Sequence, residues 1–151
     1  MSETLSMILR AMIGAFIGTV GFAMLVHVPR KAWLPCGVIA GLAYLLYWGL
    51  VQAGLSDPMG IFIGSLFGSL TGQLCARKMK IIGTVFLMSA IVPVVPGLGL
   101  YRMMSYLGQG QTSAGADFGI RAMITIAMIA LGMSMGSFID RLIHHSSLPR
   151  E

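Results

Sequence analysis

The chain has 151 residues, of which 56% are hydrophobic and 10% are charged, and its mean hydropathy is +0.86. Soluble domains carry about 25% charged residues, so this composition excludes an ordinary soluble protein and predicts an all-α integral membrane protein. The formal net charge of +5 comes from basic residues between apolar stretches, where they act as topology signals, and we expect no nucleic-acid partner.

The apolar stretches predict about five transmembrane helices in a single transmembrane domain. A helix needs about 20 apolar residues to cross a hydrocarbon core of roughly 30 Å. The first stretch has no basic segment before it and no small-residue cleavage site after it, so we expect no removable signal peptide. The Gly, Gln and Ser-rich segment 108–117 is expected to be a loop. The predicted spans are residues 11–28, 33–55, 59–76, 81–107 and 118–139.

The third predicted span carries two stripes of residues at a four-residue spacing. A stripe of glycines on one helical face lets the backbone of another helix approach closely, which predicts tight packing. The neighbouring stripe is polar, and its side chains either bond to an adjacent helix or line a polar path. The packing stripe is Gly60, Gly64, Gly68 and Gly72, and the polar stripe is Ser65, Ser69 and Gln73.

The fourth predicted span is interrupted by a Pro-x-x-Pro-Gly motif. Pro93 and Pro96 each lack an N–H and clash with the carbonyl four residues back, so the helix must open between Ile91 and Gly97. Open backbone at membrane depth is tolerated where protein covers it or where it lines a watery cavity, and such broken helices form substrate sites in many transporters. The motif therefore predicts either a substrate site or a kink that only shapes packing.

An anion site is predicted at the start of the second half-helix. The N–H groups of Leu98 and Gly99 have no partner within the helix, and the positive end of the helix dipole lies there. Arg102 lies about one turn further along, where it either contacts the substrate or extends to the outer interface. The predicted substrate-binding residues are Pro93, Pro96, Gly97, Leu98, Gly99, Tyr101 and Arg102, with Ser65, Ser69 and Gln73 from the third span.

Cofactor and metal chemistry is not expected. Cys36 and Cys75 fall near segment ends that we place on the cytoplasmic side, where thiols stay reduced, so we expect no disulfide and no zinc set. The pair His144 and His145 is interpreted as a solvated tail. The chain has no His-Glu-x-x-His, no Gly-x-Ser-x-Gly and no paired membrane aspartates, so we expect no enzymatic activity.

The three aspartates are all expected at segment ends. These are Asp57, Asp117 and Asp140, and Asp140 is expected in the polar tail of the last span. We therefore expect any carboxylate that couples transport to an ion gradient to come from another chain.

The basic residues are distributed unevenly about the predicted spans. Cytoplasmic segments carry an excess of Lys and Arg, so the richer side marks the cytoplasm. This asymmetry predicts an N-terminus outside and a C-terminus in the cytoplasm. One side has Arg30, Lys31, Arg77, Lys78, Lys80, Arg141 and Arg150, against Arg10, Arg102 and Arg121 on the other side or within the membrane.

Two short motifs carry a resemblance to a known family. The first is Gly21-Phe22-Ala23-Met24 followed by Val28-Pro29-Arg30-Lys31-Ala32, and the second is Val92-Pro93-Val94-Val95-Pro96-Gly97 followed by Tyr101. In order and spacing, nearly the whole chain resembles the C-terminal membrane half of the threonine/serine exporter family. This half also occurs as a separate small protein similar to a bacterial succinate exporter subunit.

The resemblance implies a small subunit of a split exporter in the bacterial plasma (inner) membrane. Full-length members of the family have about ten spans, and split versions supply the two halves as two proteins, so it implies a companion that resembles the N-terminal half. It also implies a secondary transporter, and the chain has no Gly-x-x-x-x-Gly-Lys-Ser/Thr loop for ATP.

The sequence is compatible with two functions. One is a subunit of a two-component exporter of small carboxylates, either threonine and serine or a dicarboxylate such as succinate. The other is a non-transporting scaffold whose glycine stripes hold an assembly together. The backbone between Ile91 and Gly97 separates them, because a polar cavity there favours transport and a seal of side chains favours a scaffold.

Overall fold

The computed structural model describes residues 2–145, and all of its regular structure is helical over that range. Within these residues, three helices are long and apolar enough to cross a membrane, and the shorter apolar stretch Met12–Leu25 lies in the first helix. The prediction of an all-α membrane protein is confirmed. The six helices are α1 (Ser2–Leu25), α2 (Arg30–Gln52), α3 (Asp57–Met79), α4 (Gly83–Ile91), α5 (Gly97–Gly108) and α6 (Thr112–His145).

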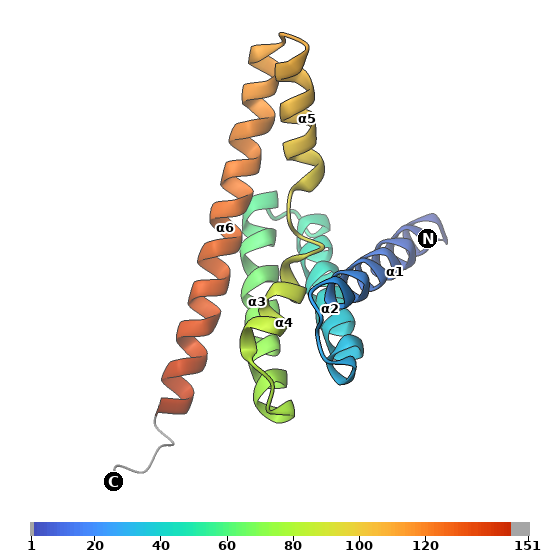
Figure 1. Cartoon of the computed structure of the whole chain (residues 1–151). Helices are drawn as coiled ribbons and strands as arrows, with labels where there is room; N and C mark the ends of the chain where they lie inside the picture. Colours follow the sequence, from blue (N-terminus) through green and yellow to red (C-terminus); the bar gives the residue numbers. More distant parts are fainter. Residues whose placement is uncertain (1, 146–151) are drawn as a thin grey trace.

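Helix α3 is the centre of the bundle. It packs against α2 and α4 on one side and against α6 along much of its length (Figure 1). Helix α1 packs mainly on α2 and crosses the bundle at a steep angle, whereas α5 lies beside the upper part of α6. The α5–α6 hairpin therefore extends past the ends of α2 and α3 (Figure 1).

The glycine stripe of α3 faces α2 and α4. A Cβ atom added at Gly64 would lie 3.2 Å from the Ala43 carbonyl oxygen of α2, and one added at Gly72 would lie 3.3 Å from the Phe86 Cβ of α4. These separations leave little room for a side chain, so the glycines permit the close approach of both neighbours. Gly68 is buried in the same stripe.

Two glycines of α6 meet the polar stripe of α3, which neighbours its glycine stripe. A Cβ atom added at Gly132 would lie 2.6 Å from the Phe62 carbonyl oxygen, and one added at Gly136 would lie 2.7 Å from the Ser69 Cβ. Small residues therefore stand on both sides of this contact, which is the arrangement that allows membrane helices to pack backbone to backbone.

The prediction of a loop over residues 108–117 is wrong. The connection comprises residues 109–111, and α6 begins at Thr112. Gly115 and Gly119 of this first part of α6 lie against Leu107 and Met103 of α5, at 2.8 and 2.9 Å from an added Cβ. Packing against α5 thus outweighs the low helix propensity of a Gly and Ser-rich segment.

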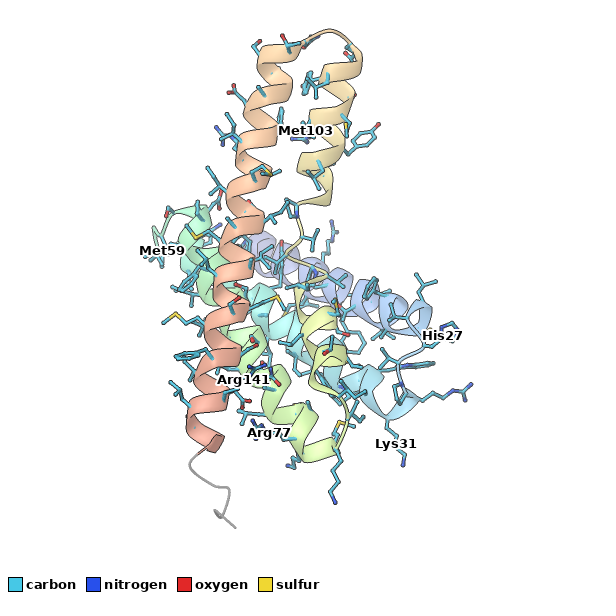
Figure 2. The ribbon with its side chains drawn as sticks, turned by 60° about the vertical axis from the view of Figure 1, so that its left-hand side comes forward. His27, Lys31, Met59, Arg77, Met103 and Arg141 are labelled. Carbon is cyan, nitrogen blue, oxygen red and sulfur yellow. The ribbon has the colours of Figure 1, made fainter. Side chains whose placement is uncertain are left out.

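One end of the bundle collects most of the basic side chains, and we call it the basic end. Lys31, Arg77 and Arg141 lie toward this end in Figure 2, where α2 and α4 begin and α3 and α6 end. Arg150, also assigned to this side from the sequence, lies outside the described residues. The members that the structure describes are Arg30, Lys31, Arg77, Lys78, Lys80 and Arg141.

Candidate functional site

The helix is broken between α4 and α5, as the two prolines predict. The N–H groups of Val94 and Val95 both donate to the Ile91 carbonyl, at 2.9 and 3.1 Å, and close the end of α4. The Gly97 N–H then donates to the Val95 carbonyl at 2.8 Å, around a Pro96 with φ −77° and ψ 54°. This is an inverse γ-turn, and it separates the two half-helices within five residues, 92–96.

Helix α5 begins with unbonded backbone donors. The Leu100 N–H donates to the Pro96 carbonyl at 3.0 Å. Among the described residues, no group accepts a hydrogen bond from the N–H of Leu98 or Gly99. Two free donors therefore stand at the positive end of α5, where a negative group is favoured.

A cavity of about 470 Å³ opens beside the break, and we call it the break cavity. Its wall combines the unwound segment with the end of α2, the start of α3 and the middle of α6. The residues that line it are Tyr44, Tyr47, Asp57, Ile61, Pro93, Val94, Pro96, Leu98 and Thr125.

A second cavity, of about 360 Å³, lies on the α1 side of the break. It shares Tyr44 and Pro93 with the break cavity and is otherwise lined by Gly14, Ala15, Gly18 and Val92. The unwound segment thus borders two cavities, and polar side chains lie mainly in the wall of the break cavity.

The polar groups of the break cavity come from residues that the sequence did not single out. The Tyr47 hydroxyl donates to Asp57 Oδ1 at 3.3 Å, and the Tyr44 and Tyr47 rings lie 5.8 Å apart at 59°. Asp57 is the first residue of α3, and Thr125 lies on α6. The sequence predicts for Asp57 only a place at a segment end, because nothing local to it indicates that the end of α2 and the broken helix meet there.

Tyr101 and Arg102 are placed away from the break cavity. The Tyr101 side chain is 70% exposed, and the Arg102 guanidinium lies over the Phe118 ring of α6, with Cζ 5.7 Å from the ring centroid. Phe118 also stacks on Tyr106 at 5.5 Å. Both predicted residues therefore belong to the α5–α6 hairpin, whereas Pro93, Pro96 and Leu98 line the cavity, with Gly97 and Gly99 beside them in the chain.

Comparison with protein families decides the class of the protein. Residues 11–139 match the family model of the threonine/serine exporter ThrE. The chain belongs to the threonine/serine exporter family. The matched region contains the break and every residue that lines the two cavities, and the family shows a transport role of the exporter type in a membrane. No solved structure matches the chain.

In this exporter-family chain, the polar stripe of α3 lies at the contact with α6. The Ser69 hydroxyl donates to the Met133 carbonyl at 3.1 Å, and the Gln73 Nε2 donates to Ser137 Oγ at 3.4 Å. Ser65 bonds within α3, to the Phe62 carbonyl at 2.9 Å. None of the three lines either cavity described above. The bonds of Ser69 and Gln73 join α3 to α6, whereas that of Ser65 stays within α3.

The expectation that Asp140 belongs to a polar tail is wrong. Its carboxylate is buried, with 4% of the residue exposed, and Oδ2 accepts a hydrogen bond from Arg77 Nη2 at 2.6 Å in an ion pair. Arg77 stands at the end of α3, so the pair joins α3 to α6 at the basic end. Burial of a charge requires such a partner, and the approach of the two helices through small residues brings the partner within reach.

The side chains that could bind a metal ion do not form a cluster among the described residues. Cys36 is a buried free thiol and Cys75 is a half-buried one. Over the part of the chain that the structure describes, no three His, Cys, Asp or Glu side chains come together. The side chains of His144 and His145 lie outside the described residues.

Proposed function

We propose that this chain is the membrane half of a two-component secondary exporter of small carboxylates, with the break cavity as its substrate site. One observation carries the proposal: the unwound segment 92–96 borders a cavity that Leu98 also lines, and the N–H groups of Leu98 and the next residue, Gly99, are free. A carboxylate placed there accepts both hydrogen bonds and lies at the positive end of α5.

The size and walls of the cavity suit a small polar metabolite. Its volume of about 470 Å³ lies within the range of small-molecule sites, roughly 300 to 1,000 Å³. Ile61 and Val94 supply apolar walls, and the hydroxyl groups of Tyr47 and Thr125 supply polar contacts. Threonine, serine and a dicarboxylate such as succinate all fit this description.

A companion membrane protein that resembles the N-terminal half of the family would complete the transporter. The outer face of the α5–α6 hairpin supports this, because large apolar side chains are exposed along it and the hairpin extends past α2 and α3 (Figure 1). Two halves of opposite orientation form a substrate site between them in many secondary transporters. The exposed residues include Leu98, Tyr101, Met104, Ile120 and Met123.

We place the chain in the bacterial inner membrane with its N-terminus outside and its C-terminus in the cytoplasm. The basic end supports this orientation, because the excess of Lys and Arg in membrane proteins marks the cytoplasmic side.

The scaffold function has a specific observation in its favour as well. Small residues mediate the contacts of α3 with α2, α4 and α6, which is the packing expected of an assembly subunit. A scaffold, however, needs no open backbone beside a cavity, so the two functions assign different roles to the break.

The double substitution Pro96→Ala with Gly97→Ala tests the proposal. Alanine has an N–H and the highest helix propensity, so the two half-helices should join and the N–H groups of Leu98 and Gly99 should become bonded. We expect loss of labelled threonine, serine and succinate export from preloaded cells that express both halves. A pull-down of the companion should show that assembly persists.

The matched control is Pro35→Ala, which removes a proline from inside α2 that lines neither cavity. It should leave export unchanged. Full export by the double variant, at equal amounts of assembled protein, would refute the break cavity as the transport site and leave the scaffold function.

A further inference from the structure

We propose that Asp57 binds the ammonium group of a zwitterionic amino acid in the break cavity, and that it makes the site selective for amino acids over dicarboxylates. This inference rests on the proposed function, because it takes the break cavity to be the substrate site. It assigns a specificity-determining residue and chooses between the two substrate classes left open above.

The Asp57 carboxylate has one hydrogen-bond partner in the wall of the break cavity. Oδ1 accepts the Tyr47 hydroxyl at 3.3 Å, and no ion pair joins Asp57 to any side chain that the structure describes. The residue stands in the first turn of α3, where a negative side chain is favoured by the helix dipole. The Asp57 carboxylate, which is exposed at this edge of the cavity, thus has a hydrogen-bond donor on one oxygen and no cationic partner among the described residues.

The wall of the break cavity carries groups of both polarities. Leu98, whose N–H is free, and Asp57 line the same cavity, so its wall offers both a positive helix end and a negative carboxylate. An α-amino acid carries both complementary charges, and its carboxylate and ammonium can be bound together. A dicarboxylate carries two negative charges, and its second carboxylate is repelled when it approaches Asp57.

Two tyrosines form an aromatic part of the cavity wall. The Tyr44 and Tyr47 rings line the cavity beside Asp57, and the face of an aromatic ring attracts a cation. The Tyr47 hydroxyl also fixes the orientation of the carboxylate through its hydrogen bond. Tyr47 therefore acts as a positioning residue for Asp57, and both rings favour an ammonium group at this end of the cavity.

The test compares threonine with 3-hydroxybutyrate, which has the same carbon skeleton and hydroxyl group but no ammonium group. Export of both labelled compounds is measured from preloaded cells that express both halves, for the wild type, Asp57→Asn, Asp57→Glu and Tyr47→Phe. The control is Asp117→Asn, which removes an exposed carboxylate of α6 that lines neither cavity.

The wild type should export threonine in preference to 3-hydroxybutyrate. Asp57→Asn should lower the ratio of threonine to 3-hydroxybutyrate export by roughly tenfold or more, the range of a charge-assisted hydrogen bond. Export of 3-hydroxybutyrate and succinate should stay the same or rise. Tyr47→Phe should lower the ratio less, and Asp57→Glu and Asp117→Asn should keep it.

A ratio that Asp57→Asn leaves unchanged overturns the inference, including the case in which the two rates fall together. Failure of the proposed function gives a different result. In that case the Pro96→Ala, Gly97→Ala double variant exports both compounds fully, whatever the substitution at position 57 does to their ratio.

Discussion

Residues in the left-handed backbone region end four of the helices, and they are not all glycines. After α3, for example, the Ile81 N–H reaches back to the Ala76 carbonyl at 3.0 Å, the pattern of a Schellman cap. Glycine adopts this conformation freely, whereas a residue with a Cβ is strained in it. The four positions are Gly54 (φ 99°), Gly110 (φ 75°), His27 (φ 58°) and Lys80 (φ 55°).

Lys80→Gly should stabilise the protein by about 1 kcal/mol, because it removes the strain of a left-handed lysine while it keeps the turn. The measurement is the free energy of unfolding in detergent micelles during titration with a denaturing detergent. Lys78→Ala is the control, since it removes a charge from the same end but at an ordinary helical position. An unchanged or lower free energy of unfolding for Lys80→Gly would contradict the argument.

At the scale of elements, two pairs of glycines on α6, on different faces of the helix, serve two partners in succession. Gly115 and Gly119 lie against α5, and Gly132 and Gly136, further along the same helix, lie against α3. The helix is 34 residues long, which is about 50 Å. This length lets it join the α5 hairpin to the central bundle.

Gly136→Ala should destabilise the protein by about 1 to 3 kcal/mol, as an overpacked contact does. The new Cβ would lie 2.7 Å from the Ser69 Cβ and 3.1 Å from the Leu66 carbonyl oxygen, so α6 must move away from α3. The same unfolding measurement applies. Gly49→Ala is the matched control, because an added Cβ there meets nothing within 4 Å and the helix gains propensity. Equal stability of the two variants would show that the contact of Gly136 with α3 has room for a methyl group.

At the scale of the whole molecule, the chain reversals fall into two groups at opposite ends of the bundle. The basic end holds the turns after α1 and α3, and the other side holds the turns after α2 and α5 (Figures 1 and 2). Charged ends of membrane helices stay on their own side of the bilayer, so this grouping should correspond to the two faces of the membrane.

A reporter that is active only in the cytoplasm should give signal when fused after the C-terminus or within the turn at Lys80. The same reporter fused at Ser56 or Gly110 should be silent, because these turns lie on the opposite side from the basic end. The amount of each fusion in the membrane fraction serves as the control. The reverse pattern of signals would overturn the orientation proposed here.

The sequence by itself determined the features that depend on local covalent structure. Proline has no N–H, so the opening between Ile91 and Gly97 followed from Pro93 and Pro96 alone. The apolar composition required helices, because only internal hydrogen bonds satisfy a backbone in lipid. The spacing of the glycines on α3 likewise gave a face for close packing, since helical periodicity fixes which residues share a face.

Only the tertiary structure decided which faces meet. The contact of Tyr47 with Asp57 joins α2 to α3, and the ion pair of Arg77 with Asp140 joins residues 63 positions apart. Whether Ser69 lined a path or bonded to α6, and whether Arg102 faced the break or Phe118, depended on the rotation and crossing of neighbouring helices. Periodicity within one helix places a residue on a face but does not say which helix covers that face.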